Sequence, residues 1–340
     1  MSENRDVWVF VEQQDGKVPE VSLELLAKGR ELAERLNSQV WALLCGHQAS
    51  ALAAQAIQHG AERVLLADHP ELALYRTLPY TRVMADLVRQ YQPYIFLIGA
   101  TPVGRDLAPR LASAVKAGLT ADCTDLQIGD FTSKKDNRVY QDLLYQIRPA
   151  FGGNLIATIV NPKTRPQMAT VREGVVRRAE PDLTRAGIVE NVMPAFQPED
   201  FALQVLSREV REPSVHLKEA PVIVAGGGGV ESAEEFELLR ELANLMGGEL
   251  GASRAAVDAG FVSREHQIGQ TGTTVRPRLY IAAGISGAVQ HRAGMDQSNK
   301  IIAINTDPNA PIFQVAHYKI VGDVAEVLPM LIRALREKTK

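Results

Sequence analysis

The 340-residue sequence contains only two cysteines, Cys45 and Cys123, and neither stands in the spacing of a metal-binding motif. Two thiols cannot form a disulfide framework, and the favoured interpretation is reduced thiols in the cytoplasm. The first ten residues, MSENRDVWVF, also lack the charged-then-apolar layout of a secretory signal peptide. We therefore expect a cytoplasmic protein without a metal centre.

An excess of charge and long apolar runs are missing as well. The formal net charge is −3, so no basic surface for nucleic acid is implied. No apolar run approaches the roughly 20 residues that span a bilayer. Hydrophobic residues make up 46% and charged residues 23% of the chain, which is ordinary for a globular protein. We expect no nucleic-acid partner, no direct membrane insertion, and enough length for two domains.

The first half alternates apolar runs with segments of helical spacing. We expect strands at Val7–Val11, Val40–Cys45, Arg63–Ala67 and Tyr94–Ile98, and helices at Ser22–Leu36, Ser50–His59 and Thr81–Tyr91. This alternation predicts a parallel sheet covered by helices on both faces. Short β-rich runs between Val139 and Val175 indicate hairpins or an added mixed sheet.

A proline-rich and charged segment, Ala179–Pro221, has weak periodicity and is interpreted as the junction between two domains, 1–205 and 215–340. The alternation then resumes, with strands expected at Val222–Ala225, Leu279–Ala283 and Ile301–Asn305 and helices at Glu234–Met246 and Asp323–Lys338. The predicted fold class is α/β, with two α/β domains built on parallel sheets.

Glycines and isolated polar residues follow these expected strands in the second half. The run VIVAGGGGV, Val222 to Val230, suits a sharp turn near an anion, but a turn without ligand is about equally plausible. Arg254 follows a short strand and would place a cation beside a reducible ring, although a surface ion pair with Asp258 is the simpler alternative. Thr271 lies in a glycine-flanked turn and could bond a ring nitrogen or simply belong to a loop.

The segment GISGAVQHRAG, Gly284 to Gly294, places Ser286 and His291 where a strand gives way to a helix. Ser286 would suit a phosphate or ring carbonyl. A protonated His291 would balance a reduced, anionic ring, whereas an ordinary helix-surface role is the alternative. Asn305 and Asp323 are expected either to contact a ribose or phosphate, or to provide turn and N-cap hydrogen bonds.

Taken in order, the segments SRAAVDAG, QIGQTG, YIAAGISGAVQHRAGM, AINTDPNAPIF and IVGD resemble the α subunit of electron transfer flavoproteins. The resemblance covers nearly the whole chain. It implies a Rossmann-like C-terminal domain that binds FAD, no catalytic residue of its own, and an N-terminal domain that packs on a β subunit. The FAD-binding residues that it implies are Ser253, Arg254, Ile268, Gly269, Gln270, Thr271, Ser286, Gly287, Ala288, Val289, Gln290, His291, Asn305 and Asp323.

The resemblance further implies that Arg254, Thr271 and His291 lie around the flavin ring and stabilise its one-electron-reduced, anionic form. Positive charge and hydrogen-bond donors near a ring favour its reduced anion, which raises its potential. The chain would shuttle single electrons from the β subunit to an acyl-CoA dehydrogenase or a quinone reductase.

Two segments of the first half, GATPVGRDLAPRLA and GLTADCT, are most similar to a subgroup that performs NADH-dependent electron bifurcation. That subgroup implies a second FAD in the β subunit, with NADH and ferredoxin or flavodoxin as further partners. A simple electron carrier with AMP in the β subunit and a non-redox nucleotide-binding module are the alternatives.

One departure concerns charge. Where the family usually has GGRG, this chain has Gly226, Gly227, Gly228 and Gly229, so Gly228 replaces an arginine that contacts FAD. His317 and Lys319 also replace the family's Asp and Gly. We expect one positive contact fewer to the flavin.

Overall fold

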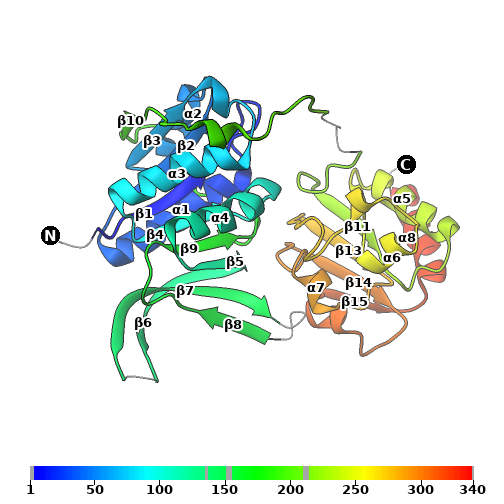
Figure 1. Ribbon diagram of the computed structural model, residues 1–340. Coiled ribbons are helices and arrows are strands. Elements are labelled where there is room, and N and C mark those ends of the chain that lie inside the picture. Colours follow the sequence, from blue (N-terminus) through cyan, green and yellow to red (C-terminus); the bar gives the residue numbers. More distant parts are fainter. Residues whose placement is uncertain (1–3, 135–136, 151–154, 210–213, 339–340) are drawn as a thin grey trace. The chain divides into compact units, whose positions relative to one another are not determined.

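The computed structural model describes residues 4–134, 137–150, 155–209 and 214–338 (Figure 1). The chain separates into two compact units between Arg208 and Glu209. Each unit has its own sheet and its own hydrophobic core. This confirms the predicted fold class of two α/β units with parallel sheets.

The first unit is built on a seven-stranded sheet with the order β10-β3-β2-β1-β4-β9-β5, in which every pair is parallel. In chain order the strands are β1 (Val7–Val11), β2 (Val40–Gly46), β3 (Arg63–Asp68), β4 (Ile95–Gly99), β5 (Leu119–Cys123), β9 (Gln167–Val171) and β10 (Ile188–Asn191). The central strands are buried along their whole length because helices cover both faces.

Alternate residues of β1 enter two separate cores. Val7 and Val9 pack with α1 (Glu20–Leu36) and α2 (Ser50–Gln58), whereas Trp8 and Phe10 pack with α3 (Thr77–Tyr91) and α4 (Pro102–Val115). This period of two is what a strand between two helical layers requires. Short 3-10 helices, η1 (Pro70–Leu72) and η3 (Pro198–Phe201), complete the unit among the described residues.

The β-rich middle of the chain contributes to two different sheets. β6 (Asp125–Thr132), β7 (Val139–Ala150) and β8 (Leu155–Ile159) form the predicted added sheet, which is antiparallel. β9, expected in the same sheet, instead lies in the parallel sheet between β4 and β5. The local sequence of a short strand does not determine which neighbour it will pair with.

Two segments with prolines or glycines form regular structure. The segment around Gly104 begins α4: Pro102 occupies its first turn and the Thr101 hydroxyl accepts from the Gly104 N–H at 2.9 Å. The expected junction contains β10, which pairs with β3 and carries an ion pair between Glu190 and Arg63, 3.0 Å apart. Helix N-termini tolerate proline, and a short edge strand has little apolar periodicity.

The second unit has a five-stranded parallel sheet with the order β12-β11-β13-β14-β15. Its strands are β11 (Val222–Gly226), β12 (Glu249–Ala252), β13 (Leu279–Ala283), β14 (Ile301–Asn305) and β15 (Tyr318–Val321). One face packs on α5 (Ala233–Leu245), α6 (Arg254–Asp258) and α8 (Val324–Lys338). The other face is covered by loops with α7 (Val289–Arg292) and η5 (Pro311–Gln314). A short 3-10 helix, η4 (Arg264–His266), lies between α6 and β13 in the chain.

The strand order of this second sheet creates a crevice at one place. The chain passes from β11 outward to β12 and then returns to the opposite side of β11 as β13. The connection after β11 leads to one face of the sheet and the connection after β13 to the other. Ligands of open α/β sheets bind outside the carboxyl ends of the strands at such a switch point. None of the described helices is long and apolar enough to cross a membrane.

Candidate functional site

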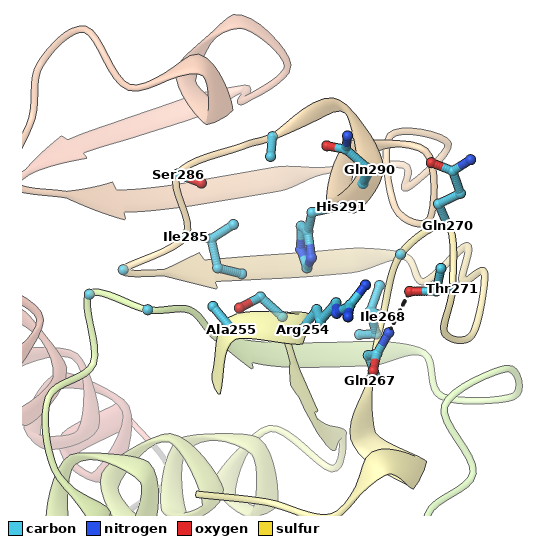
Figure 2. Close-up of a pocket in the computed structure, with 16 residues that line it drawn as sticks. Arg254, Ala255, Gln267, Ile268, Gln270, Thr271, Ile285, Ser286, Gln290 and His291 are labelled. Carbon is cyan, nitrogen blue, oxygen red and sulfur yellow. Dashed lines mark hydrogen bonds between the residues drawn. The ribbon is translucent and has the colours of Figure 1, made fainter. Parts of the chain in front are cut away.

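A cavity of about 460 Å³ lies at the carboxyl ends of β11, β12 and β13, which is the switch point of the second sheet. Its volume is within the range of about 300–1,000 Å³ that is typical of small-molecule sites. Figure 2 shows its wall, with Arg254 and Ala255 on one side, the 267–271 turn on another, and Ser286, Gln290 and His291 above.

The loops after β11 and β13 form the glycine-rich part of the wall. A β-carbon on Gly227 would lie 2.3 Å from the Gly284 carbonyl oxygen, so this close approach requires glycine. The Gly229 N–H donates to the same oxygen at 2.9 Å. Gly228, between them, is exposed and lines the cavity. The turn therefore brings bare backbone to the edge of the site.

Arg254 supplies the positive charge among the lining residues. Ser253 caps α6, where its hydroxyl accepts from the Ala256 N–H at 3.4 Å, and Arg254 follows in the first turn. The Arg254 Nε donates to Asp258 Oδ2 at 3.3 Å, and the Arg254 side chain is 71% exposed. The surface ion pair considered from the sequence is thus present. Exposed pairs of this kind contribute only about 0–1 kcal/mol, so an anion in the cavity would compete for the guanidinium.

The turn after η4 presents Thr271 to the cavity. The Gln267 side-chain amide donates to the Thr271 hydroxyl oxygen at 2.9 Å, which leaves the hydroxyl hydrogen available to another acceptor. The Gln270 N–H donates to the Gln290 carbonyl oxygen at 2.7 Å and ties this turn to α7. Gly269, with φ +137°, sits where a β-carbon would lie 2.9 Å from that carbonyl.

His291 points into the cavity from α7 and is buried, with 7% of its surface exposed (Figure 2). Its Nε2 lies 2.9 Å from the hydroxyl oxygen of Tyr280 on β13. Burial lowers the pKa of His291 to about 4, and the backbone of Ile268 offsets only part of this effect. The protonated ring considered from the sequence is therefore not the favoured form in this structure, and His291 is a neutral hydrogen-bonding group near pH 7.

Ten of the fourteen residues singled out from the sequence line this one cavity. They are Ser253, Arg254, Ile268, Gly269, Gln270, Thr271, Ser286, Ala288, Gln290 and His291. Gly287, in the loop before α7, and Val289, the first residue of α7, alternate with them but do not line the wall themselves.

The two remaining residues make local hydrogen bonds. The Asn305 side-chain amide donates to the Ile285 carbonyl oxygen at 3.0 Å, and its Oδ1 accepts from the Asp307 N–H at 2.9 Å. Asp323 Oδ1 accepts from the Ala325 N–H at 2.9 Å, at the start of α8. Asn305 thus supports the loop that carries a lining residue, and Asp323 has the N-cap geometry that was the alternative.

Six lining residues were not selected from the sequence: Gly228, Gly229, Ala255, Gln267, Gly284 and Ile285. The four-glycine turn was noted there but judged equally compatible with a ligand-free turn. Its pairing with Gly284 depends on two strands that are neighbours in the sheet and about 55 residues apart in the chain. Ala255 and Ile285 are apolar and carry no local signal.

The lining residues include one guanidinium, one imidazole and three side-chain amides, those of Gln267, Gln270 and Gln290. Several hydroxyl groups and glycines are also present, but no carboxylate. Within the described ranges, no group of three His, Cys, Asp or Glu residues could hold a metal ion. Such a wall suits an anionic ligand that carries a flat polar ring, and it lacks the paired carboxylates of a hydrolase.

Two protein-family models match the chain. Residues 7–196 match the electron transfer flavoprotein domain, and residues 216–296 match the electron transfer flavoprotein FAD-binding domain. The second match contains every residue that lines the cavity, whereas Asn305 and Asp323 lie beyond it.

Similar proteins extend over the whole chain. The electron transfer flavoprotein subunit alpha of Thermoanaerobacterium thermosaccharolyticum is 47% identical over 339 residues, covering 99% of both chains. That of Clostridium acetobutylicum is 48% identical, covering 98% of this chain and 97% of its own. The acryloyl-CoA reductase electron transfer subunit beta of Anaerotignum propionicum is 41% identical, covering 98% and 96%.

Proposed function

Because this chain belongs to the electron transfer flavoprotein α-subunit family, we propose that it shuttles single electrons between a β subunit and a partner dehydrogenase or reductase. The observation that carries the proposal is the coincidence of the FAD-binding family match with the cavity at the switch point. Ten residues chosen from the sequence for a flavin converge on that cavity.

FAD is the cofactor of the second unit. The residues present fit it: the cavity wall combines the Gly227–Gly229 turn, the Arg254 cation and a buried His291 whose Nδ1 has no hydrogen-bond partner among the described residues. When bound, FAD accepts and returns electrons singly. We propose that Arg254, Thr271, Ser286, Gln290 and His291 contact it.

These residues would favour a reduced ring by two means. Arg254 adds a positive charge, and its partner Asp258 is exposed enough to release it. Thr271 and His291 offer neutral donors, one exposed and one buried, and a buried donor is electrostatically stronger because water does not screen it. The apolar residues Ile268 and Ile285 of the wall exclude water from the same space.

The partners follow from the family. We propose a heterodimer with an electron transfer flavoprotein β subunit, in which domain 1–205 packs on that subunit and the second unit delivers electrons to an acyl-CoA dehydrogenase or quinone reductase. The relative from Anaerotignum propionicum, an electron transfer subunit of acryloyl-CoA reductase, supports the first kind of partner. The GATPVGRDLAPRLA and GLTADCT segments favour NADH-dependent bifurcation, with a second FAD in the β subunit and ferredoxin or flavodoxin as a further acceptor.

A flavin count and an NADH titration of the purified heterodimer test this proposal. Two FAD per heterodimer and reduction by NADH are the expected results. One FAD, with AMP in the β subunit and no reduction by NADH, would replace bifurcation with simple electron carriage. A flavin-free heterodimer that stays colourless with added FAD would favour a non-redox nucleotide-binding module and overturn the electron-transfer role.

A further inference from the structure

The hydroxyl of Tyr280 is buried beside the candidate site, behind a residue of the cavity wall. Tyr280 is the first buried residue of β13 and has no exposed surface. Its Oη lies 2.9 Å from His291 Nε2, and this is its one hydrogen bond among residues 4–134, 137–150, 155–209 and 214–338. The two rings are 6.2 Å apart between centroids. Because the Tyr280 hydroxyl has this one hydrogen-bond partner, the contact restricts where the hydroxyl hydrogen and the imidazole hydrogen can lie.

Burial raises the pKa of the Tyr280 phenol far above its usual value, so the hydroxyl keeps its hydrogen at every working pH. That hydrogen needs an acceptor, because an unpaired buried donor costs about 1–3 kcal/mol. His291 Nε2 is the acceptor within reach. If Nε2 instead carried a hydrogen and donated it to Oη, the Tyr280 hydrogen would have no partner in the described structure.

The second ring nitrogen, Nδ1, leads to the same conclusion, that the hydrogen of the neutral ring is not on Nε2. Nδ1 of His291 is buried and makes no hydrogen bond of ordinary geometry with the described residues, while the backbone of Ile268 lies close enough to favour a protonated ring. A backbone group that favours protonation is a carbonyl, which accepts a hydrogen from Nδ1 and repels a bare lone pair. One arrangement therefore suits both neighbours of the ring, with the hydrogen on Nδ1 and the lone pair on Nε2.

From this geometry we propose that Tyr280 is a positioning residue, which holds His291 in the neutral tautomer with its hydrogen on Nδ1 and its lone pair on Nε2. Ile268 and His291 both line the cavity, so the tautomer of this ring sets the dipole that this part of the wall presents to a bound ligand. The consequence for FAD rests on the proposed function, whereas the tautomer does not. Tyr280 is not among the residues that line the cavity.

Magic-angle-spinning nitrogen NMR of the purified heterodimer, labelled with ring-¹⁵N histidine, tests the tautomer directly. The spectrum of His291→Gln identifies the His291 signals by subtraction from those of the chain's seven histidines. We expect a protonated Nδ1 and an unprotonated Nε2 in the unmodified protein. In Tyr280→Phe we expect a measurable fraction of the tautomer with its hydrogen on Nε2, because the Ile268 backbone alone then favours the hydrogen on Nδ1. A hydrogen on Nε2 in the unmodified protein would overturn the proposal, even if Tyr280→Phe did not fold.

The potential of bound FAD supplies a second measurement. Tyr280→Phe should keep its FAD and change its thermal midpoint about as much as Tyr80→Phe, which removes another buried hydroxyl, bonded to the Leu72 carbonyl at 2.8 Å in the first unit. Only Tyr280→Phe should weaken binding of reduced relative to oxidised FAD, by about threefold to tenfold, seen as a lower midpoint potential.

The outcomes separate the two proposals. Equal potentials in Tyr280→Phe and Tyr80→Phe, or an unchanged His291 tautomer in Tyr280→Phe, would show that Tyr280 only fills space. A heterodimer that binds no FAD would overturn the proposed function, and the NMR spectra of that flavin-free protein would still decide the tautomer.

Discussion

Gly228 faces Ala255 across the edge of the cavity, and a β-carbon at residue 228 would lie 3.5 Å from the Ala255 methyl carbon with no other atom within 4 Å. Its backbone is not in the left-handed region. The space that a longer side chain would need at this position is therefore open. The neighbouring glycine differs, because a β-carbon on Gly227 would meet the Gly284 carbonyl oxygen at 2.3 Å.

We expect Gly228→Arg to fold normally and to bind FAD about tenfold more tightly, because an arginine–phosphate hydrogen bond contributes roughly 1.5 kcal/mol. Gly227→Ala is the control and should lower the thermal midpoint and the FAD content together. Fluorescence titration of flavin-free protein with FAD measures the affinity. Equal affinities of Gly228→Arg and the unmodified protein would mean that the phosphates do not lie beside this turn.

The buried, neutral His291 should make the protein sensitive to acid. Its pKa in the folded protein, about 4, is below the value of about 6.5 in an unfolded chain, so the unfolded state binds the proton first as the pH falls. The contribution of His291 to stability is complete above pH 6.5 and is lost toward pH 4, by about 2 kcal/mol at pH 5.

His291→Gln lacks this titration and serves as its control. Denaturant unfolding of both proteins at pH 7.5 and pH 5 should show the unmodified protein losing roughly 2 kcal/mol more than the variant. Parallel losses in the two proteins would indicate that His291 does not change its protonation on unfolding.

Gly287 should be required for the loop before α7. Its φ is +84°, and a β-carbon would lie 2.1 Å from the Ile312 backbone nitrogen. Gly287→Ala should therefore cost at least about 3 kcal/mol and reduce the FAD content. Gly247, also in the left-handed region with φ +63° but with open space around it, provides the control. Gly247→Ala should cost only about 1 kcal/mol and keep its flavin, as absorbance and thermal unfolding would show.

Asp323 offers a choice between two roles that a matched pair of variants can separate. Asp323→Ser keeps a side chain that caps α8, whereas Asp323→Ala removes the cap and should cost about 1 kcal/mol of stability. If Asp323 also binds the ribose of FAD, both variants should lose affinity equally. An Asp323→Ser protein with normal FAD affinity would leave Asp323 with the N-cap role alone.

The ion pair between Arg254 and Asp258 at the cavity edge gives a fifth prediction. Asp258→Asn removes the partner of an exposed guanidinium and should change the free energy of unfolding by less than about 0.5 kcal/mol. The released Arg254 should raise the midpoint potential of bound FAD, and Arg254→Gln should lower it, as spectroscopic redox titration would reveal. A potential that is unchanged in both variants would place the flavin ring away from α6.

Much of the fold was predictable because its signals are local. The apolar runs at Val7–Val11 and Val222–Ala225 and the helical spacing at Ser22–Leu36 each reflect burial of neighbouring residues, and the structure forms β1, β11 and α1 there. The pairing of β9 with β4 and β5 depends on strands that lie about 70 and about 50 residues earlier in the chain, which no local pattern encodes.

The sequence by itself determined the residue types of the site and their order, since glycines and polar residues must follow parallel strands whose carboxyl ends share one edge. Only the tertiary structure decided which partners these residues have, how much space surrounds them and which protonation state they adopt. It pairs Arg254 with Asp258, leaves the space at Gly228 open, and brings Tyr280 of β13 against His291 of α7. Charge and protonation depend on burial and on contacts made across the fold, and the identity of a residue alone does not specify either.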